Sequence, residues 1–214
     1  MHPLHDALTT VRTLRRSLLN TERFKGWSGP TRVISGTIAL FASVILHFVW
    51  TEATIRDQLL IWALVFAFAM VLNLGALAYW FWNDRMIQRD ITRLKPILDV
   101  MPPLAVGALF TLVLLLRKDV DLLYGAWMCM FGLTNLASRY VLPDAIALVG
   151  VFYIASGALC LLLPGLTFAQ PLAMGLVFCV GEWAGGTILY LDDRRYRAFA
   201  RELIAMETES ETSP

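Results

Sequence analysis

Apolar residues fill six long runs of the chain, and short polar connections separate these runs. Each run is apolar on all sides, whereas a helix on the surface of a soluble domain carries polar residues on one face. A stretch of about 20 helical residues crosses a hydrocarbon core ~30 Å thick. The pattern predicts an all-α, polytopic membrane bundle whose six transmembrane helices cover Val33–Trp50, Gln58–Trp82, Ile97–Leu116, Leu122–Ser138, Ala145–Leu163 and Pro171–Leu191.

Composition supports a lipid-exposed protein. The 214 residues are 57% hydrophobic and 16% charged, whereas about a quarter of the residues in a soluble domain are charged. The first apolar run follows a basic segment and carries no signal-peptide cleavage pattern, so we expect it to remain a span. A formal net charge of +1 gives no reason to expect a nucleic-acid partner, and the expected surroundings are a lipid bilayer.

Lys and Arg are distributed unevenly among the connections. One side of the predicted bundle carries fifteen of them, which are Arg12, Arg15, Arg16, Arg23, Lys25, Arg32, Arg85, Arg89, Arg93, Lys95, Arg139, Arg194, Arg195, Arg197 and Arg201. The other side carries only three, Arg56, Arg117 and Lys118. Cytoplasmic loops are enriched in Lys and Arg. The asymmetry therefore predicts that both termini are cytoplasmic, and it agrees with an even number of spans.

The two ends of the chain differ from the apolar centre. Over residues 3–22, leucines recur at helical spacing with Arg12, Arg15 and Arg16 between them. Such a basic amphipathic helix can lie on an anionic leaflet or bind a partner. We therefore expect three parts: residues 1–30 as a cytoplasmic helix and linker, residues 31–191 as the bundle, and residues 192–214 as a cytoplasmic helical tail with an acidic end. The end helices are the predicted contacts for a partner protein or a second copy.

Glu182 is the acidic residue that lies deepest in a predicted span. Ionisable groups inside a membrane are costly and are functional candidates for that reason. Glu182 shares a helix face with Gly175, Cys179 and Gly186, and such small residues let another helix approach. Glu182 should therefore point into the bundle.

Two amides join Glu182 in the predicted candidate site. Asn73 and Asn135 fall at a similar depth in spans of the same direction, about 20 Å from the outer end. Arg139 lies one turn beyond Asn135 and is the predicted counter-charge of Glu182. The layer is either a proton-linked or substrate-binding site or a hydrogen-bonded packing layer that sets helix register.

Other chemistry is weakly represented in the sequence. His47, a minor candidate, lies near the outer end of the first span, where an interfacial polar residue is the simpler interpretation. The three cysteines form no CxxC or Cys/His pattern, and no nucleotide-binding, metalloprotease or hydrolase motif occurs. We predict no metal site and no cofactor. Pro102 and Pro103 are expected to mark the start of the third span rather than a break in it.

Several segments resemble a group of small bacterial membrane proteins that have no assigned activity. The matching pieces are residues 26–29 (GWSG), 103–112 (PLAVGALFTL), 123–126 (LYGA), 139–157 (RYVLPDAIALVGVFYIASG) and 175–191. In that group the last span carries a histidine where Glu182 stands in this chain. The resemblance implies a bacterial cytoplasmic membrane and implies no reaction.

Three functional hypotheses follow from these observations. The first is a non-enzymatic regulatory, sensory or assembly module that acts through partners. The alternative is a small transporter or channel in which Glu182 binds or couples the transported species. A membrane enzyme that acts on a lipid or quinone ranks third, because no nucleophile–base pair is visible.

Overall fold

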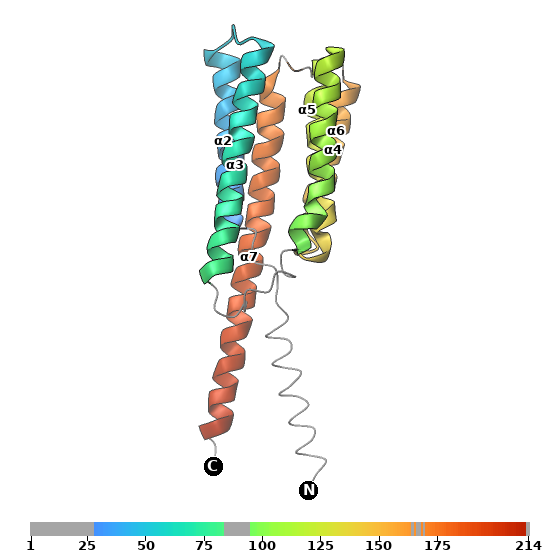
Figure 1. The fold of residues 1–214 in the computed structure, drawn as a ribbon. Helices are drawn as coiled ribbons and strands as arrows, with labels where there is room; N and C mark the ends of the chain where they lie inside the picture. The colour runs from blue at the N-terminus through green and yellow to red at the C-terminus, as the bar shows by residue number, and fades with distance from the viewer. Residues whose placement is uncertain (1–27, 84–94, 164, 166–167, 169, 213–214) are drawn as a thin grey trace.

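The computed structural model describes residues 28–83, 95–163, 165, 168 and 170–212. Within these residues, six α-helices stand side by side (Figure 1). They are α2 (Gly29–Val44), α3 (Ile55–Asn83), α4 (Lys95–Arg117), α5 (Leu123–Ala137), α6 (Ile146–Leu162) and α7 (Pro171–Thr212). The π-helical turn η1 (Ile45–Val49) extends α2, and the 3-10 turns η4 (Val120–Leu122) and η5 (Ser138–Tyr140) flank α5. The prediction of an all-α bundle of six helices is confirmed.

Four of the helices are long and apolar enough to cross a membrane. These segments are Gly29–Val49, Ile55–Asn83, Val100–Arg117 and Pro171–Phe199. The apolar α6 has 17 residues, which corresponds to about 25 Å of helix. The 15 residues of α5 are lengthened by the 3-10 turn at each end. Large apolar side chains cover the outward faces of α3 and α4, as a surface in contact with lipid requires.

Two of the helix starts that differ from the prediction involve prolines. The first helix begins at Gly29, with Pro30 in its first turn, because the fixed φ of proline suits that position. Arg32 therefore belongs to the helix and not to the polar segment before it. In the third span, Pro102 and Pro103 lie inside α4, which begins at Lys95, so the prediction that they start the helix is wrong.

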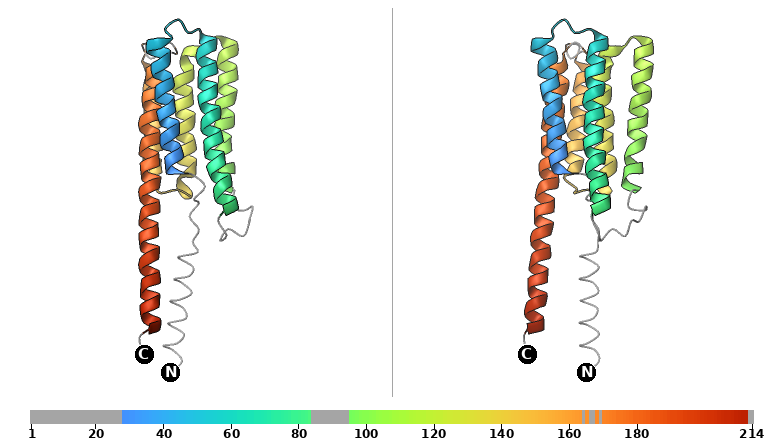
Figure 2. Two further views of the ribbon diagram at one scale, coloured as in Figure 1. Left: turned by 90° about the vertical axis from the view of Figure 1, so that its left-hand side faces the viewer. Right: turned by 60° about the vertical axis from the view of Figure 1, so that its left-hand side comes forward.

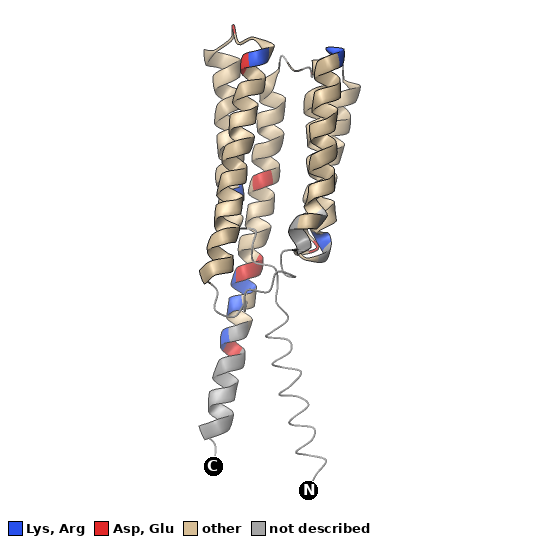
Figure 3. Ribbon diagram, in the orientation of Figure 1, with Lys and Arg blue, Asp and Glu red and all other residues tan. Residues whose placement is uncertain are grey.

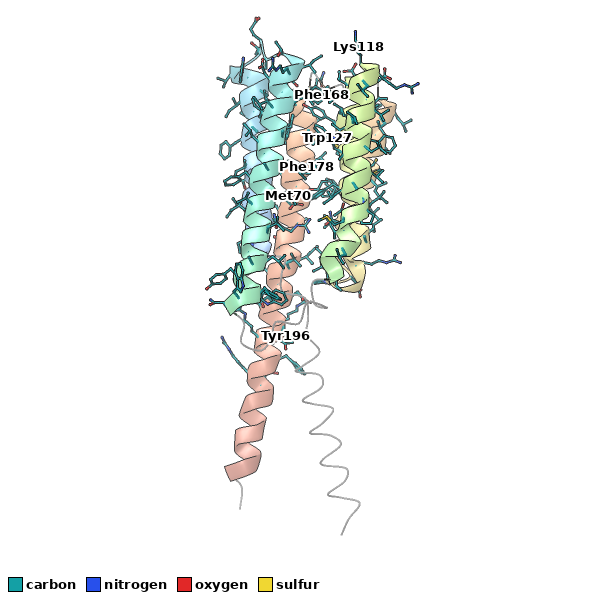
Figure 4. The ribbon with its side chains drawn as sticks, in the orientation of Figure 1. Met70, Lys118, Trp127, Phe168, Phe178 and Tyr196 are labelled. Carbon is teal, nitrogen blue, oxygen red and sulfur yellow. The ribbon has the colours of Figure 1, made fainter. Side chains whose placement is uncertain are left out.

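The helices form two units of three. In the first unit, α2 lies between α3 and α7; in the second unit, α5 lies between α4 and α6. We call the contact surface between the units the seam. Figure 4 shows Met70 and Phe178 of the first unit, Trp127 of the second, and Phe168 of the connection between α6 and α7 in the space between the two units. Large side chains therefore fill much of the seam.

Within each unit one helix pair packs with its backbones in close contact. A Cβ atom at Gly132 in α5 would lie 2.7 Å from the carbonyl oxygen of Gly150 in α6, and one at Gly157 would lie 2.7 Å from that of Gly125. In the other unit, a Cβ atom at Gly29 in α2 would lie 2.6 Å from the oxygen of Gly186 in α7. Each of these contacts requires glycine, because any side chain would meet backbone.

The last helix is far longer than the span predicted for it. Its 42 residues correspond to about 63 Å, and it runs unbroken past the start of α2, as the views in Figure 2 show. We call residues 192–212 the stalk, the end of the bundle from which it projects the stalk end, and the opposite end the hairpin end. Charged residues gather at the two ends of the bundle and along the stalk (Figure 3). The amphipathic helix predicted over residues 3–22 lies outside the described residues.

Candidate functional site

A buried ion pair joins the first and last described helices. The Arg32 Nη2 atom lies 2.7 Å from Glu182 Oε1, and its Nε atom donates to Oε2 at 3.0 Å. This two-bond geometry is the strong form of an arginine–carboxylate contact. The residues are only 7% and 5% exposed. Glu182 therefore points into the bundle, as predicted, with its charge neutralised by Arg32.

The second unit contributes two polar groups to this pair. Asn135 in α5 accepts a hydrogen bond from Arg32 Nη2 at 2.9 Å, and its own amide donates to the carbonyl of Phe131. Tyr153 in α6 has no exposed surface, and its hydroxyl lies 3.2 Å from Glu182 Oε1. We call Arg32, Asn135, Tyr153 and Glu182 the polar quartet. Its members come from four helices and two units.

Glycines provide the space that the quartet occupies. A Cβ atom at Gly185 would lie 2.7 Å from the Arg32 Cζ atom, and one at Gly36 would lie 2.7 Å from the Cβ atom of Glu182. Gly181 lies directly against the Tyr153 ring. The small residues beside Glu182 were expected to let a helix approach. Gly175 and Gly186 do so, since they lie against Ser43 and Gly29 of α2. At the nearby Gly181 and Gly185 the neighbour is instead a large polar side chain.

Two predicted members of the site lie elsewhere. Asn73 in α3 accepts a hydrogen bond from Thr31 at 3.2 Å. It therefore contacts α2 next to the quartet without joining it. Arg139 lies in η5 with an exposed side chain, and the guanidinium on Glu182 belongs to Arg32. Arg139 was the predicted counter-charge, and this prediction is wrong. The counter-charge comes from Arg32, because α2 begins early enough to include that residue.

His47 lies far from the quartet. It belongs to η1 at the hairpin end, where its ring makes an edge contact with Phe48 at a centroid distance of 4.6 Å. Across the part of the chain that the structure describes, no three His, Cys, Asp or Glu side chains gather as a metal site would require. The cysteines Cys129, Cys160 and Cys179 are free thiols.

Sequence reasoning missed two of the four quartet residues. Arg32 precedes the apolar run at Val33 and was assigned to the cytoplasmic charge count. Pro30 was the signal that the helix starts earlier. Tyr153 is surrounded by apolar residues in the sequence, and it lies between Gly150 and Gly157 on the face that meets α5. A hydroxyl on a glycine-marked contact face could have identified it.

The quartet's hydrogen-bonding groups largely satisfy one another. Each oxygen of Glu182 accepts from Arg32, and Oε1 is also within reach of the Tyr153 hydroxyl. A buried charge is tolerated when it is paired and hydrogen-bonded in this way. The arrangement can hold helices in register, and it contains no nucleophile next to a free base.

Comparisons with protein families, curated proteins and solved structures return no match to this chain.

Proposed function

We propose that this protein is a non-enzymatic module of a bacterial cytoplasmic membrane that acts through a protein partner as a regulatory, sensory or assembly subunit. The observation that carries the proposal is α7, one unbroken helix that crosses the bundle and continues as the stalk. A membrane of about 30 Å needs only about 20 of its 42 residues. The remainder is available outside the membrane.

The stalk surface suits a protein contact. Arg194, Arg195, Arg197 and Phe199 are exposed, and Tyr196 lies on the same segment (Figure 4). Aromatic and arginine side chains are the residue types most enriched at the energetic centres of protein interfaces. The stalk therefore offers both an apolar anchor and charged neighbours.

The charge distribution supports a cytoplasmic stalk. Once Arg32 is counted inside α2, fourteen Lys and Arg residues belong to the stalk end and its flanking segments, against three at the hairpin end. The positive-inside rule then orients the stalk end toward the cytoplasm. Both chain ends would meet soluble partners there.

Truncation tests the module hypothesis directly. We compare the full chain with a chain that ends after Arg194 and with one that lacks residues 1–22, each produced at native level in the source bacterium. We expect all three to give a folded bundle of the same thermal stability in detergent. The full chain should migrate on a native gel in a larger complex that at least one truncation loses. A complex that survives both truncations, or no complex for the full chain, contradicts the proposal.

A small transporter or channel is the second candidate, and the position of the quartet favours it. The ion pair sits at the seam between two units, where relative movement would expose it. In proteoliposomes, Glu182→Gln should abolish flux of protons or cations while the purified amount is unchanged, and Asp193→Asn in the stalk serves as the matched control. Equal flux through the two variants rejects this candidate.

A further inference from the structure

The contacts between the two units differ at two levels along the seam, and the ring contacts of Phe178 with Phe131 and Tyr153 lie between these levels. Tyr124 and Asn135, which mark the two levels on α5, are 11 residues apart in the helix numbering, or about 16 Å along its axis. The two levels differ in chemistry. The hairpin-end level is aromatic and the stalk-end level is polar.

The hairpin-end contact is large and tightly buried. Trp62 of α3 donates to the Tyr124 hydroxyl at 2.8 Å, and the Tyr124 hydroxyl lies 3.4 Å from Gln58. Phe168, from the connection between α6 and α7, packs on Tyr124 with a centroid distance of 4.5 Å. Trp62, Tyr124 and Phe168 belong to a core cluster of ten buried residues.

The stalk-end contact is smaller. Two hydrogen bonds of the polar quartet cross the seam there, from Arg32 to Asn135 and from Tyr153 to Glu182. Beyond them, Leu142 and Ile146 of the second unit meet Leu189 of α7 in a cluster of three buried residues. Since helix association in a membrane depends on van der Waals packing, the smaller stalk-end contact holds the units together less strongly.

Both charged residues of the quartet lie in the same unit, so the two units can separate without leaving a charge unpaired. Arg32 and Glu182 both belong to the first unit, and their two direct hydrogen bonds do not cross the seam. Parting the units would therefore leave the ion pair intact. The polar groups exposed by such a movement are an amide and a phenol on one side and a neutralised pair on the other, and water can solvate all of them. The contacts of Phe178 with Phe131 and Tyr153 would part with them, as would the small cluster around Leu189.

We propose that the molecule opens along the seam at its stalk end, with the aromatic contact of Trp62, Tyr124 and Phe168 as the hinge and Asn135 and Tyr153 as the latch. Opening gives water access to the Arg32–Glu182 pair from the stalk end. It also changes the position of α7, and with it the stalk, relative to α5 and α6. The close glycine contacts keep α2 with α7 and α5 with α6 during the movement.

Distance measurements between paired spin labels test the proposal. The stalk-end labels replace Trp82 of α3 and Leu98 of α4, whose side chains are 73% and 67% exposed. The hairpin-end labels replace Ile55 of α3 and Leu116 of α4, which are also exposed. Each pair is introduced into the full chain with Cys129, Cys160 and Cys179 changed to alanine, and each is measured in lipid nanodiscs with and without the latch changes Asn135→Leu and Tyr153→Phe.

The expected result is specific to one end. Removing the latch should add a population several ångströms longer to the stalk-end distances and leave the hairpin-end distances unchanged. The matched control, Thr111→Val, removes the acceptor of a 2.8 Å hydrogen bond between α4 and α5 inside the second unit. It leaves the Trp127 ring in place and should alter neither pair. Unchanged stalk-end distances, or broadening at the hairpin end, overturn the proposal.

A second variant keeps the test decisive if the double latch change prevents folding. Tyr153→Phe alone retains the ring, which contacts Phe131 and Phe178 at centroid distances of 5.0 and 5.1 Å. It should broaden the stalk-end distances in the same direction by a smaller amount. Identical distances in this variant and the unaltered chain contradict the latch. The measurement needs no partner, so its failure leaves the module hypothesis to its own test.

Discussion

The contacts inside each unit and the contacts across the seam are built from different groups. Inside a unit, α5 and α6 meet backbone to backbone at Gly132 and Gly150. Across the seam, side chains such as Trp62 and Tyr124 span the space. A backbone contact cannot adapt when an atom is added, whereas side chains can change rotamer. The comparison shows which helices must move together and where two groups of helices could part.

The largest loss of stability should come from adding a side chain where two helix backbones are in contact. Gly132→Leu would force its side chain against the Gly150 carbonyl and Ile154. This substitution should lower the free energy of unfolding by more than about 3 kcal/mol, which is at or beyond the upper range for overpacking. We expect little folded protein by size-exclusion chromatography in detergent.

Gly75→Leu is the matched control for that change. Gly75 lies in α3, and a Cβ atom there meets nothing within 4 Å. Replacing an exposed helical glycine stabilises a helix by up to about 1 kcal/mol. If Gly75→Leu and Gly132→Leu are equally damaging, close helix contact is not the reason for the glycines.

The next largest effect concerns the ion pair. Arg32→Met leaves Glu182 buried without its cation, and breaking a buried pair costs about 3–5 kcal/mol in soluble proteins. We expect about 2–3 kcal/mol here, since groups in a membrane-inserted unfolded state also find partners. The double variant Arg32→Met with Glu182→Leu should be less destabilised than Arg32→Met alone in thermal unfolding.

The stalk provides a control for the pair. Arg197 Nη2 lies 2.7 Å from Asp193 Oδ2 one turn earlier, and the Arg197 side chain is largely exposed. Such surface pairs contribute only about 0.3–0.5 kcal/mol. Arg197→Met should therefore leave the unfolding temperature nearly unchanged. If the double variant Arg32→Met with Glu182→Leu unfolds at a lower temperature than Arg32→Met alone, the unpaired charge is not the cause of the instability.

The two levels of the seam should contribute independently. Trp62→Phe removes the hydrogen bond to Tyr124, and Tyr153→Phe removes the one to Glu182. Each should cost about 1 kcal/mol. Because the levels are well separated, the loss of stability in the double variant should equal the sum of the two single losses within about 0.5 kcal/mol. A larger coupling in the double-mutant cycle would mean that the seam behaves as one contact.

The smallest effect lies within one unit, away from the seam. Lys118 directly follows α4 with a φ of 63°, and the amide of Asp119 donates back to the carbonyl of Leu114 at 3.0 Å. This left-handed position favours glycine. Lys118→Gly should stabilise the protein by about 1 kcal/mol, while Lys118→Ala, which removes the charge but keeps the Cβ atom, should not. Equal stability of the two variants would contradict the conformational explanation.

The sequence alone was sufficient for the number and class of helices. A continuous apolar run in a membrane satisfies its backbone hydrogen bonds internally if it is helical, so the six runs corresponded to six helices. Most helix ends shifted by a few residues, and α7 continued through the predicted helical tail. The position of Glu182 inside the bundle was also predictable. A charged side chain within a span is costly in contact with lipid, and the small residues on its helix face let another helix approach there.

Only the tertiary structure decided which residues meet Glu182. Depth along a helix placed Asn73, Asn135 and Glu182 at one level, but depth does not specify which helices are neighbours. The packing of α7 on α2 brought Arg32 to the acid, and the packing of α5 and α6 brought Asn135 and Tyr153. Helix order around the bundle depends on contacts between distant parts of the chain, such as Gly29 with Gly186. No local pattern in the sequence specifies those contacts.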